Sequence, residues 1–197
     1  MSVGSENIAR ATDVLRRGEL VVYPTETVYG LGADALDADA VERVFEVKGR
    51  DRSKPISMAV PDVETALKYV EPTARERRFL DEFLPGPVTV VLERREAVPD
   101  ALTASRDRVG LRVPDHEIAL GLLERIAPLT STSANVSGRP SVRHVPDLDP
   151  EIREAVAAII DGGETPGGGS TVVDVEAGEI IRRGAMAERV EAWLAEC

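Results

Sequence analysis

Short apolar runs alternate with amphipathic helical segments along the chain, and this alternation restricts the possible fold more than any other feature. Helical spacing of apolar residues occurs at residues 7–17, 39–47, 63–70, 74–83, 118–126, 151–157 and 188–195. Extended runs lie between them at residues 20–23, 56–60, 88–92, 109–114, 129–131, 170–175 and 180–182. No segment repeats at a fixed period, and no stretch resembles a linker. We therefore predict one α/β domain over residues 1–197.

Charge and cysteine content narrow the class of function. A net charge of -11 argues against a general nucleic-acid-coating role, which needs a basic excess. No apolar run could span a bilayer and the polar start is unlike a signal peptide, so we expect a cytoplasmic protein without a membrane partner. The single cysteine, Cys197, and two unconnected histidines, His116 and His144, offer neither a zinc site nor a nucleophilic triad. Hydroxyls, cations and backbone amides must then carry the function, which favours catalysis by positioning and charge stabilisation.

The first polar cluster follows the apolar run at residues 20–23 and reads PTETVYGLG. It brings three hydroxyls and one carboxylate together after a strand: Thr25, Glu26, Thr27 and Tyr29. The glycines fit the pattern G-x-G-x-x-A, but in a dinucleotide fold they would follow the strand directly, without this polar loop. We interpret the segment as a ligand loop, and the alternative is a tight turn into the next helix.

Three further segments are rich in cations, hydroxyls or glycines. KGRDRSKP, at residues 48–55, holds two of the three lysines in a chain with 21 arginines, and its cations suit a polyphosphate better than a helix-end charge alone. TSTSANVSGRPSV, at residues 130–142, carries six hydroxyls that fit phosphate or adenine contacts, or simple turns. GGETPGGGST has Gly169 where a P-loop needs lysine, which leaves a flexible turn or a mobile cover over a substrate.

In this order, PTETVYGLG, the KGR segment, PGPVTVVL, VGLRVP, STSANVSGRPS and GGSTVVDV followed by an RRG strand resemble the YrdC/Sua5 family of L-threonylcarbamoyladenylate synthases. The resemblance covers nearly the whole chain. It implies a single YrdC-like domain, in the short form without the C-terminal Sua5 domain. The expected fold is a twisted open mixed sheet, flanked by helices, with a concave basic cleft.

The resemblance also implies the reaction. Such a nucleotidyltransferase forms threonylcarbamoyl-AMP and diphosphate from L-threonine, bicarbonate and ATP, for the N6-threonylcarbamoyladenosine (t6A) modification of tRNA. Mg²⁺ would enter with ATP, without a protein-only metal site. Contact with tRNA or double-stranded RNA, and handover to the threonylcarbamoyl-transfer complex, are further implied partnerships.

Individual residues receive roles through the same resemblance. L-threonine would contact Thr27, Arg112, Ser131 and Ser170, with its carboxylate on Arg112. ATP would contact Arg50, Lys54, Ser133, Asn135, Ser141 and Arg182. Lys48 and Arg50 are the candidate catalytic residues, because fixed cations stabilise the charge that develops as a carbamate meets the α-phosphate.

Three residues depart from the family pattern, and rival interpretations remain open. Thr132 replaces a proline, Ala59 replaces a histidine that some members place near threonine, and Arg108 stands where some relatives offer a threonine hydroxyl to ATP. One rival is a YciO-like paralogue that keeps the fold without this activity, and another is a double-stranded RNA- or tRNA-binding module. A carbamoyl-transfer domain of hydrogenase maturation is a third, but its accompanying zinc-finger-like segments are missing from the sequence.

Overall fold

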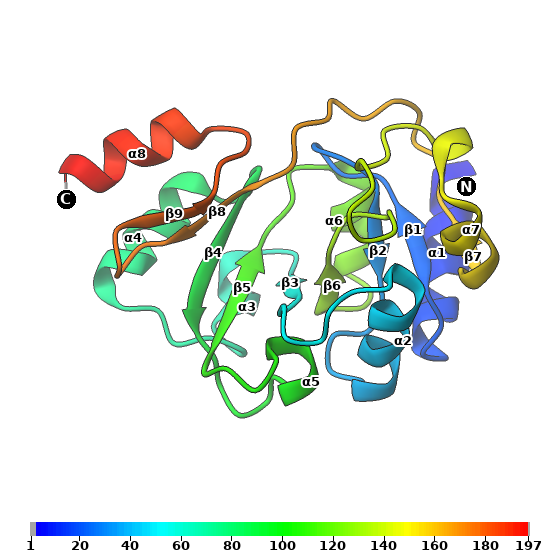
Figure 1. Ribbon diagram of the computed structural model, residues 1–197, viewed down its shortest axis with the longest axis horizontal. Coiled ribbons are helices and arrows are strands. Elements are labelled where there is room, and N and C mark those ends of the chain that lie inside the picture. Colours follow the sequence, from blue (N-terminus) through cyan, green and yellow to red (C-terminus); the bar gives the residue numbers. More distant parts are fainter. Residues whose placement is uncertain (1–2, 197) are drawn as a thin grey trace.

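The computed structural model describes residues 3–196, and Cys197 lies outside the described residues. The helices are α1 (Val3–Arg16), α2 (Ala38–Lys48), α3 (Val63–Ala66), α4 (Ala74–Phe83), α5 (Asp100–Thr103), α6 (Glu117–Leu123), the 3-10 helix η1 (Val145–Asp147), α7 (Pro150–Ala155) and α8 (Ala187–Glu196). The strands are β1 (Val21–Tyr23), β2 (Gly30–Gly32), β3 (Ser57–Ala59), β4 (Val88–Glu93), β5 (Arg108–Arg112), β6 (Leu129–Ser131), β7 (Ala158–Ile159), β8 (Thr171–Asp174) and β9 (Glu179–Arg182). Helices flank the strands along the whole molecule, so the predicted α/β class is confirmed (Figure 1).

The strands form two sheets that meet at one edge. One sheet has the order β2-β1-β7 and the other β6-β3-β5-β4-β8-β9, and each contains parallel and antiparallel pairs. The two are linked between β2 and β6, where Leu31 N donates to Thr132 O and Thr130 N donates to Ala33 O, both over 2.9 Å. The predicted mixed sheet therefore continues across both groups of strands.

Alternating burial along the strands explains why the molecule has two apolar cores. Val22 of β1 and Met58 of β3 belong to the larger core, together with residues of α2 and α4. Val21 and Ala59, one position away on the same strands, belong to the smaller core with α1 and α6. Successive side chains of a strand point to opposite faces, so β1 and β3 each contribute to both cores and are held between them.

Helix α2 has clear start and stop signals, and its end is important for the site. Asp37 accepts hydrogen bonds from the backbone N–H groups of Asp39 and Ala40 at its start. Gly49 ends the helix in the left-handed conformation, with φ of 55°, which glycine adopts without strain. The chain therefore turns sharply after Lys48, the last residue of the helix.

Several elements differ from the prediction, among them strand β7 at residues 158–159, where no strand was predicted. Residues 30–32, expected as a ligand loop or turn, form strand β2 and pair antiparallel with β1. Helix α3 ends at Ala66 instead of residue 70, because Val70 forms a bridge with Arg94. The short helices α5 and η1 lie where no helix was predicted, as expected for segments too short to be helical without tertiary contacts. Within residues 3–196, no helix is both long enough and apolar enough to cross a membrane.

Candidate active site

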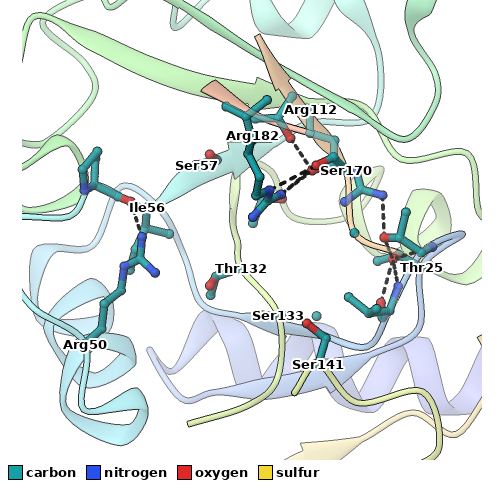
Figure 2. Close-up of a pocket in the computed structure, with 18 of the residues that line it drawn as sticks. Thr25, Arg50, Ile56, Ser57, Arg112, Thr132, Ser133, Ser141, Ser170 and Arg182 are labelled. Atoms are coloured by element: carbon teal, nitrogen blue, oxygen red, sulfur yellow. Dashed lines mark hydrogen bonds between the residues drawn. The ribbon is translucent and has the colours of Figure 1, made fainter. Parts of the chain in front are cut away.

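An open pocket of about 790 Å³, its solvent-filled mouth included, lies where segments from both sheets meet. Figure 2 shows Arg112, Ser170 and Arg182 on one side of it, Ser133 and Ser141 opposite, and Arg50 at one end. The lining residues are Tyr23, Thr25, Thr27, Val28, Gly30, Arg50, Pro55, Ile56, Ser57, Thr89, Arg112, Ser131, Thr132, Ser133, Ser141, Gly169, Ser170, Val172 and Arg182. Three of these described residues are arginines and none is Asp or Glu, so the pocket favours anionic ligands.

Two glycines make room for Tyr23 and Ser57, which are among the residues that line this pocket. A Cβ at Gly32 would lie 2.9 Å from the ring of Tyr23, and one at Gly110 would lie 2.3 Å from Ser57 Oγ. No larger residue fits at either position without a shift of the chain. The glycines of PTETVYGLG therefore serve close packing against Tyr23. Burial raises the pKa of Tyr23 to about 12, so its hydroxyl stays protonated near neutral pH.

Arg112 and Thr27 form the end of the pocket that the resemblance assigns to threonine. Arg112 Nη2 donates to Thr27 Oγ1 over 3.0 Å, and Glu26 Oε1 lies 2.9 Å from the same nitrogen. Thr25 Oγ1 donates its one proton to Val28 O over 2.7 Å, so the 2.9 Å bond between Thr25 and Thr27 must use the proton of Thr27. Thr27 Oγ1 then accepts from Arg112 and keeps one lone pair, which suits a ligand donor such as an ammonium group.

Ser170 connects the arginine of β9 to a threonine of β4. Arg182 Nη2 donates to Ser170 Oγ and to its carbonyl oxygen, both over 2.9 Å, and Thr89 Oγ1 lies 2.9 Å from Ser170 Oγ. Burial lowers the pKa of Arg182, and repulsion from Arg112 and Arg50 lowers it further. An anionic ligand would relieve this repulsion among three arginines that the fold holds in place.

A second pocket adjoins the first and shares Arg50 and Ser133 with it. Arg50 donates from Nε to Lys54 O over 3.1 Å and from Nη2 to Pro55 O over 2.8 Å, and burial lowers its pKa. These bonds hold the guanidinium at the boundary of the two pockets. The second pocket is lined by Lys48, Arg50, Asp51, Lys54, Ser133, Asn135, Ser137 and Gly138.

Lys48 supports the loop that follows β6. Its side chain is buried, with the residue only 2% exposed, and its amine donates to the backbone carbonyls of Ser133 and Asn135, the latter over 2.7 Å. Burial, followed by repulsion from Arg50, lowers the pKa of Lys48 to about 8. The Asn135 amide donates to two carbonyls of the same loop over 2.9 and 2.8 Å and accepts from Ser133 Oγ. Both side chains therefore hold Ser133 in place.

The glycine-rich segment between β7 and β8 passes from one sheet to the other, along the top of Figure 1. Gly167 N donates to Thr27 O over 2.6 Å near the end of the segment. At its start, Tyr29 Oη donates to Gly163 O over 2.7 Å and accepts from Gly162 N over 3.0 Å. The segment is thus tied to Thr27 and to Tyr29 of PTETVYGLG, and its opening as a cover stays a prediction.

All the residues to which the resemblance gives a catalytic or binding role lie at one of the two pockets. Those at the first are Thr27, Arg50, Arg112, Ser131, Ser133, Ser141, Ser170 and Arg182. Those that lie at the second alone are Lys48, Lys54 and Asn135. Ser57 and Thr89 also line the first pocket and were not predicted, although each is a hydroxyl residue in an otherwise apolar strand, which is a usable signal.

The three departures from the family pattern have different consequences. Thr132 lines the first pocket. Ala59 is buried in β3, opposite Arg112 of β5, and is not a lining residue of either pocket. Arg108 lines neither pocket, because it pairs with Asp174 over 2.6 Å and with Glu76 over 3.0 Å. Arg108 therefore ties β5 to β8 and α4.

These features define a class of protein: an α/β fold with a pocket that presents fixed arginines and hydroxyls to a ligand with several anionic groups. The model of the family described as "Telomere recombination" (Sua5_yciO_yrdC) matches residues 13–184. The chain belongs to this Sua5/YciO/YrdC family, as its motifs predict.

Individual relatives agree with this membership. The chain is 43% identical to the threonylcarbamoyl-AMP synthase of Pyrococcus abyssi over 168 residues, which are 84% of this chain and 49% of the relative. The structure is similar to that of P. abyssi Sua5 complexed with L-threonine, with a TM-score of 0.89, 38% identity, and coverage of 100% of this chain and 59% of that one. It is also similar to E. coli YciO, with a TM-score of 0.81, 28% identity, and coverage of 92% and 90%. The chain thus spans about half the length of the Pyrococcus synthase.

Proposed function

We propose that the chain is a transferase that forms threonylcarbamoyl-AMP and diphosphate from L-threonine, bicarbonate and ATP. The observation that carries the proposal is the gathering of the eight first-pocket residues around one cavity lined by three arginines. The relatives support it, since the P. abyssi relative is named threonylcarbamoyl-AMP synthase and the P. abyssi Sua5 structure was determined with L-threonine.

The end of the pocket at Arg112 suits an amino acid. A guanidinium matches a carboxylate in charge and shape, and Arg112 lines the pocket with its side chain only 9% exposed. Thr27 Oγ1 offers an acceptor beside it, which fits the amino group of the same ligand. Ser170, held by Arg182, offers a further hydroxyl contact. A zwitterionic amino acid therefore finds both a donor and an acceptor at this end.

The remaining cations suit the phosphates of ATP. In the proposed reaction a carbamate formed on the threonine amine attacks the α-phosphorus, so two anionic groups must approach each other. Arg50 and Arg182 are held by hydrogen bonds to backbone carbonyls, so their charges are in place before the ligands arrive. Mg²⁺ would be held by phosphate oxygens and would neutralise part of their charge, because the described lining residues of the first pocket supply hydroxyl and carbonyl oxygens but no carboxylate.

Downstream steps belong to the same proposal. The adenylate would feed the t6A modification of tRNA, through handover to a threonylcarbamoyl-transfer complex or through direct tRNA contact. A YciO-like protein or a double-stranded RNA-binding module remains the alternative, since E. coli YciO has the same fold at lower identity.

Incubation with L-threonine, bicarbonate and Mg-ATP tests the proposal. We expect release of diphosphate and appearance of the adenylate, and neither should appear when threonine or bicarbonate is omitted. Turnover that is indifferent to threonine would refute the assignment. Binding of a double-stranded RNA probe without any turnover would instead favour the RNA-binding alternative.

A further inference from the structure

One buried carboxylate beside the pocket has no part in the proposed reaction. Glu26 stands between Thr25 and Thr27, which both line the first pocket, but Glu26 is not itself a lining residue of either pocket. No motif assigned it a contact. Its side chain is only 15% exposed, so its charge needs a specific partner inside the protein.

That partner is Arg112. Glu26 Oε1 lies 2.9 Å from Arg112 Nη2, and the Arg112 side chain is 9% exposed. Both Glu26 oxygens are buried without a hydrogen-bond donor among the described residues, so the contact with Arg112 is an ion pair and not a hydrogen bond. The contact is therefore held by charge and proximity. A buried carboxylate without a hydrogen bond costs stability, which calls for a reason why the pair is present.

The other titratable groups near Glu26 do not balance its charge at neutral pH. The Tyr23 hydroxyl, with a pKa of about 12, is neutral. Burial lowers the pKa of His116, and the charge of Glu26 raises it by less, so His116 is neutral as well. Arg112 is thus the cation that faces Glu26, within the part of the chain that the structure describes.

We propose that Glu26 is a positioning residue that holds the Arg112 guanidinium in the pocket wall, ready for the carboxylate of the amino-acid substrate. Thr27 and Glu26 hold Arg112 together, because Thr27 Oγ1 accepts from Arg112 Nη2 while Glu26 lies against the same nitrogen. The described contacts leave the donors of Nη1 for a ligand. This inference rests on the proposed function for the identity of the ligand.

The charges around Arg112 explain why a counter-ion is needed. Arg112 and Arg50 both lower the pKa of Arg182, so the three cations repel one another across the pocket. Without Glu26, repulsion would favour turning the Arg112 guanidinium toward solvent. A displacement of about 1 Å at such a contact can reduce an activity on the order of a hundredfold. We expect Glu26→Gln, which keeps the shape but removes the charge, to weaken L-threonine binding about tenfold to a hundredfold.

The experiment measures L-threonine affinity by calorimetry and the KM values for threonine and ATP by diphosphate release. Glu26→Gln is compared with Glu191→Gln, a matched control whose surface pair with Arg183 lies outside both pockets. We expect a higher threonine KM for Glu26→Gln, with kcat and the ATP KM within about threefold of the wild type. Glu191→Gln should match the wild type throughout. Melting curves confirm that each variant is still folded at the temperature of the assay.

Two further variants keep the test decisive. If Glu26 acts through Arg112, adding Glu26→Gln to Arg112→Gln should leave the threonine affinity of Arg112→Gln unchanged. Glu26→Asp retains the charge and should bind threonine more tightly than Glu26→Gln. If Glu26→Gln does not fold, Glu26→Ala, which also removes the charge, replaces it. Wild-type threonine affinity in Glu26→Gln, or in Glu26→Ala where that variant replaces it, would overturn the inference. Absence of turnover in the wild type would count against the proposed function alone, because threonine binding is measured separately.

Discussion

Replacement of Lys48 by methionine would remove one buried charge while keeping a side chain of similar length. In the wild type, the Lys48 amine donates to the backbone carbonyls of Ser133 and Asn135. A buried carbonyl left without a donor costs about 1–3 kcal/mol, and this variant leaves the buried contact at Asn135 and the partly buried one at Ser133 without their donor. Part of this loss is recovered, because the charge that burial disfavours, with a pKa lowered to about 8, is gone. We expect the free energy of unfolding to fall by about 2–3 kcal/mol.

This magnitude distinguishes support of the loop from simple capping of helix α2. A cation at a helix C-terminus contributes only about 0.3–1 kcal/mol. In a chain of this length, 1 kcal/mol corresponds to roughly 2–4 °C in Tm, so Lys48→Met should melt roughly 4–12 °C below the wild type. Turnover should also fall, on the order of a hundredfold, because Ser133 would move away from its place between the two pockets.

Calorimetric melting and threonine-dependent diphosphate release check both expectations. Lys68→Met is the matched control, since Lys68 is exposed and lies outside both pockets, and it should change neither quantity. Normal melting with lost turnover would mean that the Lys48 charge acts on the reacting groups directly. Early melting with full turnover would show that the position of the loop does not matter to the reaction. Either result would refute a role for Lys48 in holding Ser133 for the reaction.

Three other predictions follow from the same contacts. Arg112→Ala should weaken threonine binding about tenfold to a hundredfold, since a hydrogen bond to a charged group contributes about 1.5–3 kcal/mol, and an equal loss of ATP affinity in calorimetry would contradict this assignment. The pKa of Lys48, about 8, is below its ordinary 10.5, so the unfolded chain binds more protons between these pH values and this group makes the unfolding free energy rise with pH there. Urea unfolding at about pH 7.5 and about pH 9.5 should show a smaller rise for Lys48→Met, and equal rises would argue against the shift. Gly110→Ala should lower the unfolding free energy by about 1–3 kcal/mol, because its Cβ would lie 2.3 Å from Ser57 Oγ, and an unchanged Tm would show that β5 can move aside.

Elements that depend on nearby residues were predictable from the sequence. Helix α4 has its predicted bounds, residues 74–83, because its apolar spacing and the capping box of Thr73 and Glu76 are local signals. Strand β6 also has its predicted bounds, residues 129–131. Strand β2 was missed because its glycines have little preference for a strand, and the structure instead packs them against the ring of Tyr23.

The sequence by itself determined which chemical groups the protein could use and to which family it belongs, because ordered motifs record residue types and their spacing. Only the tertiary structure decided how these groups are connected. It directs the Lys48 amine to loop carbonyls, gives the Thr27 proton to Thr25, and sets Glu26 against Arg112. Lys48 and Ser133 are 85 residues apart, as are Thr27 and Arg112. Burial and hydrogen-bond direction at such pairs arise from packing between distant segments, and no local pattern carries that information.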